Sequence, residues 1–423
     1  MKKLLLACFA LLVTHLSYSQ ETFPVNGSWD VRSGQYAFTN VTIVVSAAQT
    51  ITNGTLVVKD GKIESVGAGT AVPKGYVTVD LKGKFIYPGL IDAYTTYGIP
   101  EAPRQAGGGF GGFGRASVPV STKPGPYGWN EAIRPDVSAL KMFHVNTTRA
   151  EEMKRNGFGA VQTLVQDGIA RGTSAVFSLA DSRDNEVIIK DEVAAHYSFS
   201  KGTAATNYPS SLMGSIALLR QTYLDAQWYK GQNKEYNISL AEFNRTQTLP
   251  QIFEVGDVQS ILRADKIAKE FGKQYIYKTD GMEYQRINAV KALNASLIVP
   301  LNFPAAFDLE DALDARNISY AQMKNWEMAP TNPAALEKAG IRFALTTNGL
   351  TNARDFWTNL RTAITNGLTE KQALLSLTEI PATMLGVSDK VGTLTKGKLA
   401  NFIITSANLF KADNVIYETW VQG

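Results

Sequence analysis

Cysteine and histidine are almost missing from this sequence of 423 residues, which contains one Cys and three His. A chain with a single cysteine forms no internal disulfide and offers no cluster of thiolate ligands. That cysteine, Cys8, lies close to the N-terminus together with His15. If this terminus is removed as a targeting segment, then His144 and His196 are the only imidazoles left to bind a metal or catalyse a reaction.

An excess of one charge is also missing, since 42 Lys and Arg stand against 38 Asp and Glu. This balance gives no argument for nucleic acid or an anionic membrane as a partner. A phosphate-binding G-x-x-x-x-G-K-[ST] motif is absent. Residues 109–114, GFGGFG, match G-x-G-x-x-G, but Pro119, Pro124 and Pro126 follow where a dinucleotide site needs a helix. Residues 104–128 therefore predict a long Gly/Pro-rich loop and no nucleotide site.

The longest apolar run is short and lies at the N-terminus. Lys2 and Lys3 precede an apolar stretch over 4–16, and Ser17-Tyr18-Ser19 supplies small residues on both sides of a cleavage position. This pattern is typical of a secretory signal peptide. A membrane span needs about 20 apolar residues, so the run is short for an anchor. We expect residues 1–19 to be removed and the protein to be exported, either periplasmic or extracellular, without a membrane anchor.

Residues 20–84 have the texture of β-structure. Asn53-Gly54 and Asp60-Gly61 each separate short apolar runs. Both dipeptides suit the tight turns of hairpins, in which the two central residues have positive φ. The sequence therefore predicts a meander of short strands in this region.

Residues 386–423 return to the same texture. Strand-like runs at 391–394 and 401–404 flank a predicted turn at 396–398, and 420–423 are again strand-like. We expect this segment to complete a small β-sandwich domain with residues 20–84. Because the last run has no closing turn, it is also compatible with a longer native chain.

Residues 85–385 alternate strand-like and helical stretches. The strand-like runs are 160–165, 251–253, 275–277, 297–299 and 343–345. The helical stretches include 257–271, 282–294 and 333–339. Alternation over about 300 residues favours an α/β fold with a parallel sheet, and a (β/α)8 TIM-like barrel is the natural size match.

Several stretches combine into recognisable motifs. They are GTLVVKDGKIESVG at 54–67, DLKGKFIYPGLIDA at 80–93, GLTEKQALLSLTEIPA at 367–382, LGV at 385–387 and VGTLTKGKLA at 391–400. Together they resemble the amidohydrolase superfamily, close to its imidazolonepropionase-like branch, over nearly the whole mature chain. The resemblance implies a barrel with a small β-domain and a family activity of hydrolysing non-peptide C–N bonds. It also implies one or two metal ions, which polarise a carbonyl and activate a bound water.

The ligand positions that this resemblance implies are occupied by other residues. The family's H-x-H pair falls on Tyr94 and Thr96, and its aspartate after the last strand falls on Asn348, in ALTTN at 344–348. An asparagine has no carboxylate to act as a general base. By a looser match, two further histidine positions fall near Glu254 and Lys278. These positions therefore resemble vestiges of a metal site.

The first interpretation is a degenerate amidohydrolase domain, a pseudoenzyme that keeps the fold and serves as a scaffold. The segment at 208–226, YPSSLMGSIALLRQTYLDA, resembles part of exported proteins with tandem amidohydrolase domains, in which the N-terminal domain would be the degenerate one. The expected partner is a second, catalytic amidohydrolase domain or a homologous subunit. No metal or other cofactor is expected under this interpretation.

The second interpretation is an active hydrolase with a rebuilt site. Carboxylates that could lie around the barrel mouth are Asp92, Glu101, Glu254, Asp257, Asp280 and Glu283. Of these, Asp92, Glu254 and Asp280 are the catalytic candidates. An oxygen-rich cluster would suit Mg or Ca better than Zn, and a metal-free route needs a carboxylic acid of raised pKa beside an ionised carboxylate. Each acid taken singly is more commonly a solvated charge or a helix cap.

The remaining interpretations concern histidines and aromatic residues. We expect His144 and His196 to have structural or surface roles. We also expect His196 to lie at the end of a helical stretch. A third function, binding a small molecule or glycan, would use aromatic side chains lining a cleft. The candidates are Trp129, Trp228, Tyr229, Trp326 and Trp357. Such residues are also ordinary in protein cores.

Overall fold

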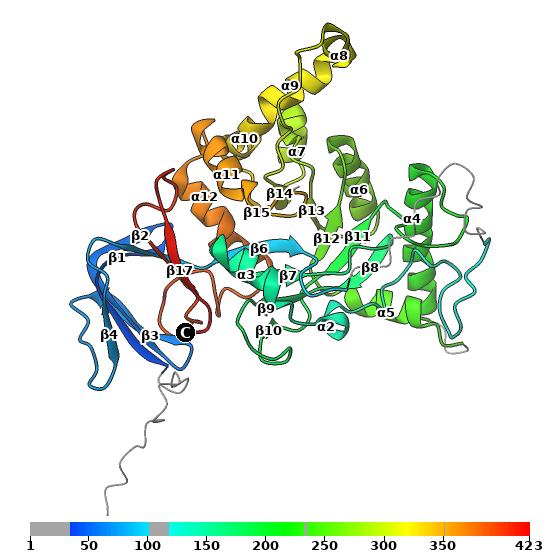
Figure 1. Cartoon of the computed structure of the whole chain (residues 1–423). Helices are drawn as coiled ribbons and strands as arrows, with labels where there is room; N and C mark the ends of the chain where they lie inside the picture. The colour runs from blue at the N-terminus through cyan, green and yellow to red at the C-terminus, as the bar shows by residue number, and fades with distance from the viewer. Residues whose placement is uncertain (1–33, 101–117, 232–234, 351) are drawn as a thin grey trace, which may run out of the picture.

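The computed structural model describes residues 34–100, 118–231, 235–350 and 352–423 (Figure 1). The predicted signal peptide at 1–19, Glu101 and the glycine-rich motif at 109–114 lie outside these ranges. None of the described helices combines the length and the apolar composition that crossing a membrane requires.

Both ends of the described chain contribute to one seven-stranded sheet. Its strands are β1 (Gln35–Ser46), β2 (Gln49–Lys59), β3 (Lys62–Ala68), β4 (Val77–Asp80), β5 (Phe85–Pro88), β16 (Phe402–Thr405) and β17 (Ile416–Trp420). Their order is β17-β16-β5-β1-β2-β3, with β4 paired to β1. Phe38 and Phe402 pack against Trp420 in its core. Figure 1 shows this sheet at one end of the molecule, where blue and red segments meet.

Two details of this sheet differ from the sequence prediction. Asn53-Gly54 does not form a turn but lies within β2, where Asn53 has φ 51° beside a shift in the β1–β2 register. Asn tolerates the left-handed region, so the dipeptide fits a bulge as well as a turn. The predicted turn at Asp60-Gly61 is confirmed, with φ of 49° and 76°. Residues 391–394 belong to no strand, whereas the turn at 396–397 is present.

The rest of the chain confirms a mixed α/β fold. A four-stranded sheet has the order β10 (Ile188–Lys190), β9 (Ala175–Ser178), β7 (Phe158–Thr163), β6 (Leu90–Thr95). A six-stranded sheet has the order β15 (Phe343–Thr346), β14 (Leu297–Pro300), β13 (Tyr275–Lys278), β12 (Gln251–Glu254), β11 (Ala195–Ser198), β8 (Ala170–Thr173). Strands β11 to β15 pair in parallel, as do β6 and β7. Nearly all their residues are buried, as expected for a parallel sheet covered on both faces.

The edge strands β6 and β15 meet through a side chain. The Thr346 hydroxyl lies 3.0 Å from the Tyr94 carbonyl oxygen and 2.5 Å from an Asp92 carboxylate oxygen, and it shares its one proton between these two acceptors. Backbone pairing among the described strands leaves β6 and β15 in separate sheets and not in one continuous ring. The contact nevertheless places the carboxyl end of β6 beside that of β15, which brings two distant sequence segments to one corner.

Helices alternate with these strands and pack around them. They are α2 (Ala139–Met142), α3 (Thr147–Arg155), α4 (Leu212–Tyr229), α5 (Ile238–Thr246), α6 (Val258–Glu270), α7 (Ile287–Lys291), α8 (Ala312–Asn317), α9 (Tyr320–Met328), α10 (Asn332–Ala339), α11 (Asp355–Thr365), α12 (Glu370–Leu377) and α13 (Glu379–Met384). Two 3₁₀ turns, η2 (Glu283–Arg286) and η3 (Ala329–Thr331), precede α7 and α10. The predicted helix at 282–294 is therefore divided between η2 and α7. Figure 1 shows α8 and α9 projecting from the body, and α9 has no buried residue.

Candidate functional site

Asp92 lies at the corner where β6 meets β15, and it is fully buried. One carboxylate oxygen accepts hydrogen bonds from the Tyr94 backbone N–H at 3.1 Å and the Thr346 hydroxyl at 2.5 Å. The other accepts from the backbone N–H and the hydroxyl of Thr347, at 3.0 and 2.5 Å. Burial raises the pKa of Asp92, and the donated hydrogen bonds oppose that rise. Four donors from two strands leave this carboxylate with a structural role and without access to a ligand.

Tyr94 is buried beside Arg171, a residue of β8 that is only 4% exposed. The Arg171 guanidinium donates to the Tyr94 hydroxyl at 3.1 Å and also forms an ion pair with Glu254. Burial raises the pKa of Tyr94, so its hydroxyl stays protonated at neutral pH. The position that the family resemblance gives to a metal ligand is thus held by a neutral phenol bonded to a buried cation.

Glu254 ends β12 and accepts from two donors on different oxygens. Gln166 Nε2 donates at 2.6 Å to one oxygen, and Arg171 binds the other. The Lys278 ammonium lies 3.7 Å from the first oxygen. Burial alone would raise the pKa of Glu254, but the charges of Arg171 and Lys278 hold it below its ordinary value. Glu254 is therefore an ionised carboxylate between two cations.

Asp280 and Glu283 follow β13, and their pKa values are raised, whereas that of Glu254 is lowered. Burial and the neighbouring Glu283 raise the pKa of Asp280 to about 6. Glu283 is fully buried, and burial raises its pKa although Asn332 Nδ2 donates to it at 2.5 Å. One of its oxygens has no hydrogen-bond partner among the described residues. The pKa shifts of Glu254 and Asp280 thus have opposite signs, although Glu254 ends β12 and Asp280 follows the neighbouring strand β13.

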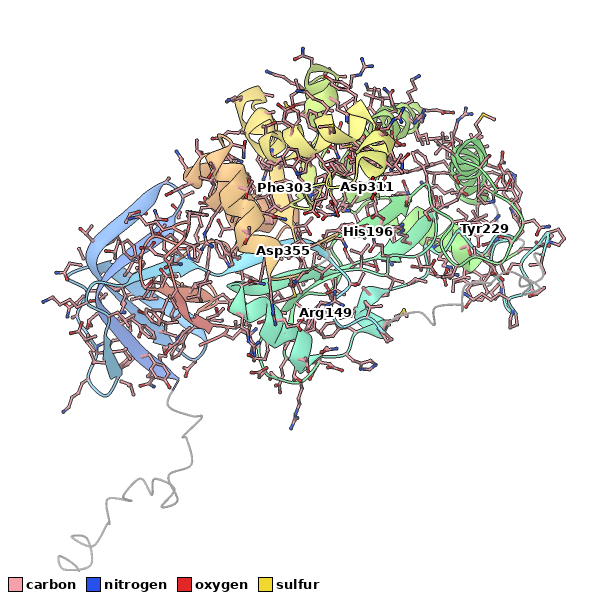
Figure 2. All side chains as sticks on the ribbon, turned by 45° about the horizontal axis from the view of Figure 1, so that its top comes forward. Arg149, His196, Tyr229, Phe303, Asp311 and Asp355 are labelled. Atoms are coloured by element: carbon pink, nitrogen blue, oxygen red, sulfur yellow. The ribbon has the colours of Figure 1, made fainter. Side chains whose placement is uncertain are left out.

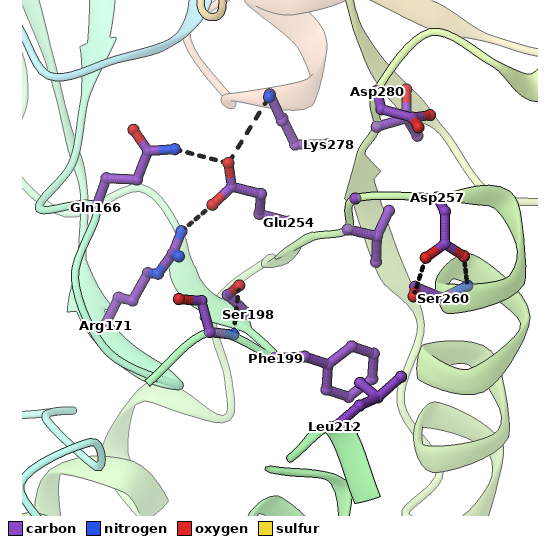
Figure 3. Close-up of a pocket in the computed structure, with 14 residues that line it drawn as sticks. Gln166, Arg171, Ser198, Phe199, Leu212, Glu254, Asp257, Ser260, Lys278 and Asp280 are labelled. Carbon is purple, nitrogen blue, oxygen red and sulfur yellow. Dashed lines mark hydrogen bonds and ion pairs between the residues drawn. The ribbon is translucent and has the colours of Figure 1, made fainter. Parts of the chain in front are cut away.

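A cavity of about 630 Å³ opens between these strand ends (Figure 3). Its charged lining comprises Arg171, Glu254, Lys278, Asp257 and Asp280. Its other lining residues include Gln166, Ser198, Phe199, Ser200, Leu212, Val255 and Thr279. The structure therefore brings two of the catalytic candidates, Glu254 and Asp280, to one polar cavity, whereas Asp92 is not among the residues that line it.

Thr96 and Asn348 lie at a separate, smaller cavity of about 220 Å³, which Tyr94 also lines. The Asn348 backbone N–H donates to the Thr346 hydroxyl at 3.1 Å. Arg149 of α3 lines the same cavity. The three positions that the family resemblance gives to metal ligands are thus grouped, and they offer a phenol, a hydroxyl and an amide. Arg149 adds a cation to this corner.

The two histidines occupy different environments, and one sequence prediction about them was wrong. His196 does not end a helix: it lies in β11, 2% exposed, among the parallel strands (Figure 2). Its Nε2 is 3.2 Å from Gln162 Nε2, while Nδ1 has no partner among the described residues. Burial and the Arg171 charge lower its pKa to about 3, so the ring is neutral. His144 is exposed and lies 3.1 Å from Asp184.

The remaining candidates have ordinary roles. Asp257 caps α6 by accepting from the Ser260 backbone N–H at 2.7 Å and its hydroxyl at 2.9 Å. Trp357 packs on Phe410. The exposed aromatic candidates Trp129 and Trp228 do not line the cavity beside Glu254. Trp326 lines another, of about 730 Å³, near α9. The five aromatic residues therefore do not form one common cleft.

Sequence reasoning missed Arg171 and Gln166, which complete the environment of Glu254. The signal for Arg171 was a charged residue between Ala170 and Gly172, in a short segment that the structure buries completely. A buried guanidinium requires an anionic partner, and this requirement would have directed attention to a carboxylate at a neighbouring strand end. Gln166 lies in the loop between β7 and β8 and carried no recognisable signal.

Comparisons with known proteins agree with this architecture. Two imidazolonepropionases from Klebsiella pneumoniae are 23% and 24% identical to the chain over 374 and 376 residues, covering 83% of this chain and 85% of each relative. An amidohydrolase from Thermotoga maritima MSB8 has a similar structure, with a TM-score of 0.71 at 22% identity over 92% of this chain and 98% of its own. That likeness shows the fold. Residues 220–423 match the amidohydrolase family. The chain therefore contains a domain of the amidohydrolase family.

Proposed function

We propose that this protein is a degenerate amidohydrolase domain that acts as a scaffold or partner and not as a metal-dependent hydrolase. The observation that carries the proposal is the position of Arg171. Its guanidinium binds both Tyr94 and Glu254 at strand ends where the family resemblance would put metal ligands. A built-in cation then fills the electrostatic role of a metal ion.

The chemistry of the neighbouring donors supports the same proposal. Divalent ions require deprotonated ligands such as carboxylate, thiolate or neutral imidazole. Here Glu254 is engaged by Arg171 and faces Lys278, so an incoming cation would meet two positive charges. Among the described residues, no three His, Cys, Asp or Glu side chains are grouped in a way that could hold a metal. These residues do not fit the metal centre that the family resemblance implies.

We further propose that the four-stranded and six-stranded sheets, which include the parallel strands β6–β7 and β11–β15, form the family's (β/α)8 barrel. The contact between Thr346 and Tyr94 supports closure between β15 and β6, and the structural likeness to the Thermotoga amidohydrolase supports the architecture. In this arrangement the ends of β6, β12, β13 and β15 surround one barrel mouth, which is where barrel enzymes carry their sites.

Elemental analysis of the purified protein, produced with Zn, Mn, Mg and Ca supplied, tests the loss of the metal site. We expect far less than one metal per chain after dialysis. The variant Arg171→Gln gives a matched comparison because it removes the competing guanidinium and leaves a neutral donor. About one tightly held metal per wild-type chain, lost in Glu254→Gln, would overturn the proposal.

The proposed partner is a second amidohydrolase domain or a homologous subunit. Large apolar side chains that are more than two-fifths exposed gather around α8 and α9: Leu309, Leu313, Tyr320, Met323 and Trp326. Such a patch is typical of a protein-binding surface. Light scattering of the protein alone and mixed with a catalytic amidohydrolase chain tests the partner. Unchanged monomers in both samples would contradict it.

A metal-independent hydrolase is the second candidate, favoured by the pair Glu254 and Asp280. Both line one cavity, the pKa of Glu254 is lowered, and that of Asp280 is raised to about 6. A carboxylate that stays ionised and an acid whose pKa is raised toward neutrality are the two partners that general acid–base catalysis uses. Turnover of a panel of small amides and lactams that Asp280→Asn abolishes, with the fold retained, would establish this candidate and sink the scaffold proposal.

We also propose that the protein is exported, on the strength of the basic start and short apolar run over residues 1–19. Expression of the full chain with a C-terminal tag tests this proposal. We expect an N-terminus at Gln20 and recovery outside the cytoplasm. Retention of Met1 on protein recovered from the cytoplasm would contradict it.

A further inference from the structure

Two cations line the cavity, Arg171 and Lys278, and Lys278 has the weaker contacts with its neighbours. Lys278 is the last residue of β13 and is only 8% exposed, yet it lines the 630 Å³ cavity. Its nearest charged partner is Glu254, at 3.7 Å, which is too long for a hydrogen bond. No other described residue accepts a hydrogen bond from its Nζ. Figure 3 shows Lys278 and Arg171 on different sides of Glu254.

Glu254 is already satisfied without this lysine. Gln166 donates to the oxygen nearest Lys278 at 2.6 Å, and Arg171 binds the other oxygen. Burial lowers the pKa of Lys278, and the charge of Arg171 acts in the same direction, while Glu254 and Asp280 oppose it. A buried amine that opens to a cavity and has no tight ion pair is the usual setting of a nucleophilic lysine.

We propose that Lys278 is a nucleophilic amine that forms a reversible imine with a small neutral carbonyl compound bound in this cavity. The neutral Nζ attacks the carbonyl carbon to form an N–C bond, and the C–O bond then breaks. Both amine protons leave with the carbonyl oxygen as water, so that the step needs no oxidant or reductant. The ammonium form must first lose a proton, which leaves to the solvent of the open cavity, since Glu254 at 3.7 Å is beyond hydrogen-bond reach.

The lining selects the class of carbonyl compound. Three acids, Glu254, Asp257 and Asp280, stand against Lys278 and an Arg171 that is already bonded. An anionic carbonyl compound would meet net negative charge once the lysine is neutral. Two serine hydroxyls at the wall, those of Ser198 and Ser200, accept from backbone N–H groups and keep their own protons to donate to ligand hydroxyl groups. The cavity therefore suits a short hydroxyaldehyde or hydroxyketone.

Reductive trapping of the full chain tests this proposal directly. The protein is incubated briefly with D-glyceraldehyde and cyanoborohydride, which converts an imine into a stable secondary amine, and modified lysines are mapped by mass spectrometry. We expect Lys278 to be labelled about tenfold faster than the exposed Lys266. Pyruvate, an anionic carbonyl compound, should label Lys278 more slowly than glyceraldehyde does.

Lys273 provides the matched control. It is half-buried, its pKa is also lowered by burial, and its Nζ donates to the Gln247 carbonyl oxygen at 3.3 Å outside the cavity. Labelling of Lys278 no faster than Lys273 and Lys266 would overturn the proposal. The map uses wild-type protein, so it does not depend on whether Lys278→Gln folds. The result is independent of metal content and of amide hydrolysis, so the scaffold proposal stands or falls separately.

Discussion

Two groups of strand ends in this molecule carry carboxylates in opposite situations. At the corner of β6 and β15, Asp92 receives four hydrogen bonds from backbone and hydroxyl donors. At the corner of β12 and β13, Glu254 lies between two cations at the wall of an open cavity. At the first corner neutral donors occupy both oxygens of the carboxylate. At the second corner the charged side chains line an accessible cavity.

The difference separates a carboxylate that joins two strands from one that keeps its charge beside a cavity. A carboxylate that is fully hydrogen-bonded by its own strands joins those strands and offers nothing to a ligand. A carboxylate held by charged side chains is costly to bury, and removal of one partner leaves an uncompensated charge in the site. We therefore expect substitutions at Asp92 to change stability alone, and substitutions around Glu254 to change both stability and the chemistry of Lys278.

The largest effect is expected for Arg171→Met. This change leaves the Glu254 carboxylate without its closest cation in a mostly buried site. Breaking a buried pair by removing one partner typically costs about 3–5 kcal/mol, and Lys278 at 3.7 Å should keep the loss near the lower value. Urea unfolding of variant and wild type measures it.

The double variant Arg171→Met/Glu254→Met is the control. Removing both charges should recover most of the lost stability, because no unpaired ion remains in the site. If the double variant is as unstable as the single one, then packing of the arginine side chain and not its charge holds this corner.

Asp92→Ala comes next, at about 2 kcal/mol of lost stability. It strands the Tyr94 and Thr347 backbone N–H groups and the Thr347 hydroxyl, whereas the Thr346 hydroxyl keeps the Tyr94 carbonyl oxygen as an acceptor. It also removes a buried carboxyl whose pKa is raised by that burial. Reductive labelling at Lys278 should remain at the wild-type rate, since Asp92 does not line that cavity. A labelling rate that falls together with stability would show that the two corners are coupled.

The strands around both corners were predictable from sequence, and the contacts between them were not. Runs such as 275–277 and 343–345 are short, apolar and bounded by breakers, so local pattern alone located β13 and β15. The prediction of a turn at Asn53-Gly54 was wrong, because a residue that tolerates positive φ suits a β-bulge as well as a hairpin turn. The choice between them depends on the partner strand, which the local sequence does not specify.

The site was predictable to the extent that strand ends could be aligned with a family pattern. That alignment gave Tyr94, Glu254 and Lys278 positions at one expected metal site. In the structure Arg171 contacts both Tyr94 and Glu254, and Lys278 lies 3.7 Å from Glu254. Nothing in the sequence linked Arg171 to Glu254, which are 83 residues apart. His196 was misplaced on a helix because its segment contains Val-Ala-Ala, whereas pairing with β12 makes it a strand.

The pH dependence of stability separates two buried groups with opposite shifts. His196 has a pKa of about 3 against an ordinary 6.5, so its contribution is present above 6.5 and is lost as pH falls toward 3. Asp280 has a pKa of about 6 against 3.8, so its contribution is complete below 3.8 and is lost as pH rises toward 6. Between those limits the two groups oppose each other.

Urea midpoints at about pH 7 and about pH 4.5 for wild type and two variants measure these contributions. His196→Gln should lose less stability than wild type on acidification, because no buried imidazole is left to protonate. Asp280→Asn should lose more, because the compensating carboxyl is gone. Identical acid profiles for all three proteins would show that neither group is linked to folding in this range.

The smallest effect is expected for Asp257→Ala, which removes the N-cap of α6 beside the cavity. Asp257 accepts from the Ser260 N–H at 2.7 Å, and loss of such a cap typically costs about 1 kcal/mol. Asp311→Ala is the matched control, since Asp311 caps α8 in the same way, accepting from the Leu313 N–H at 2.7 Å. Because α8 projects from the body, that loss should hardly change global unfolding. Equal losses at both caps would mean that the projecting helices unfold together with the body, and that even the most exposed segment of the chain belongs to its cooperative core.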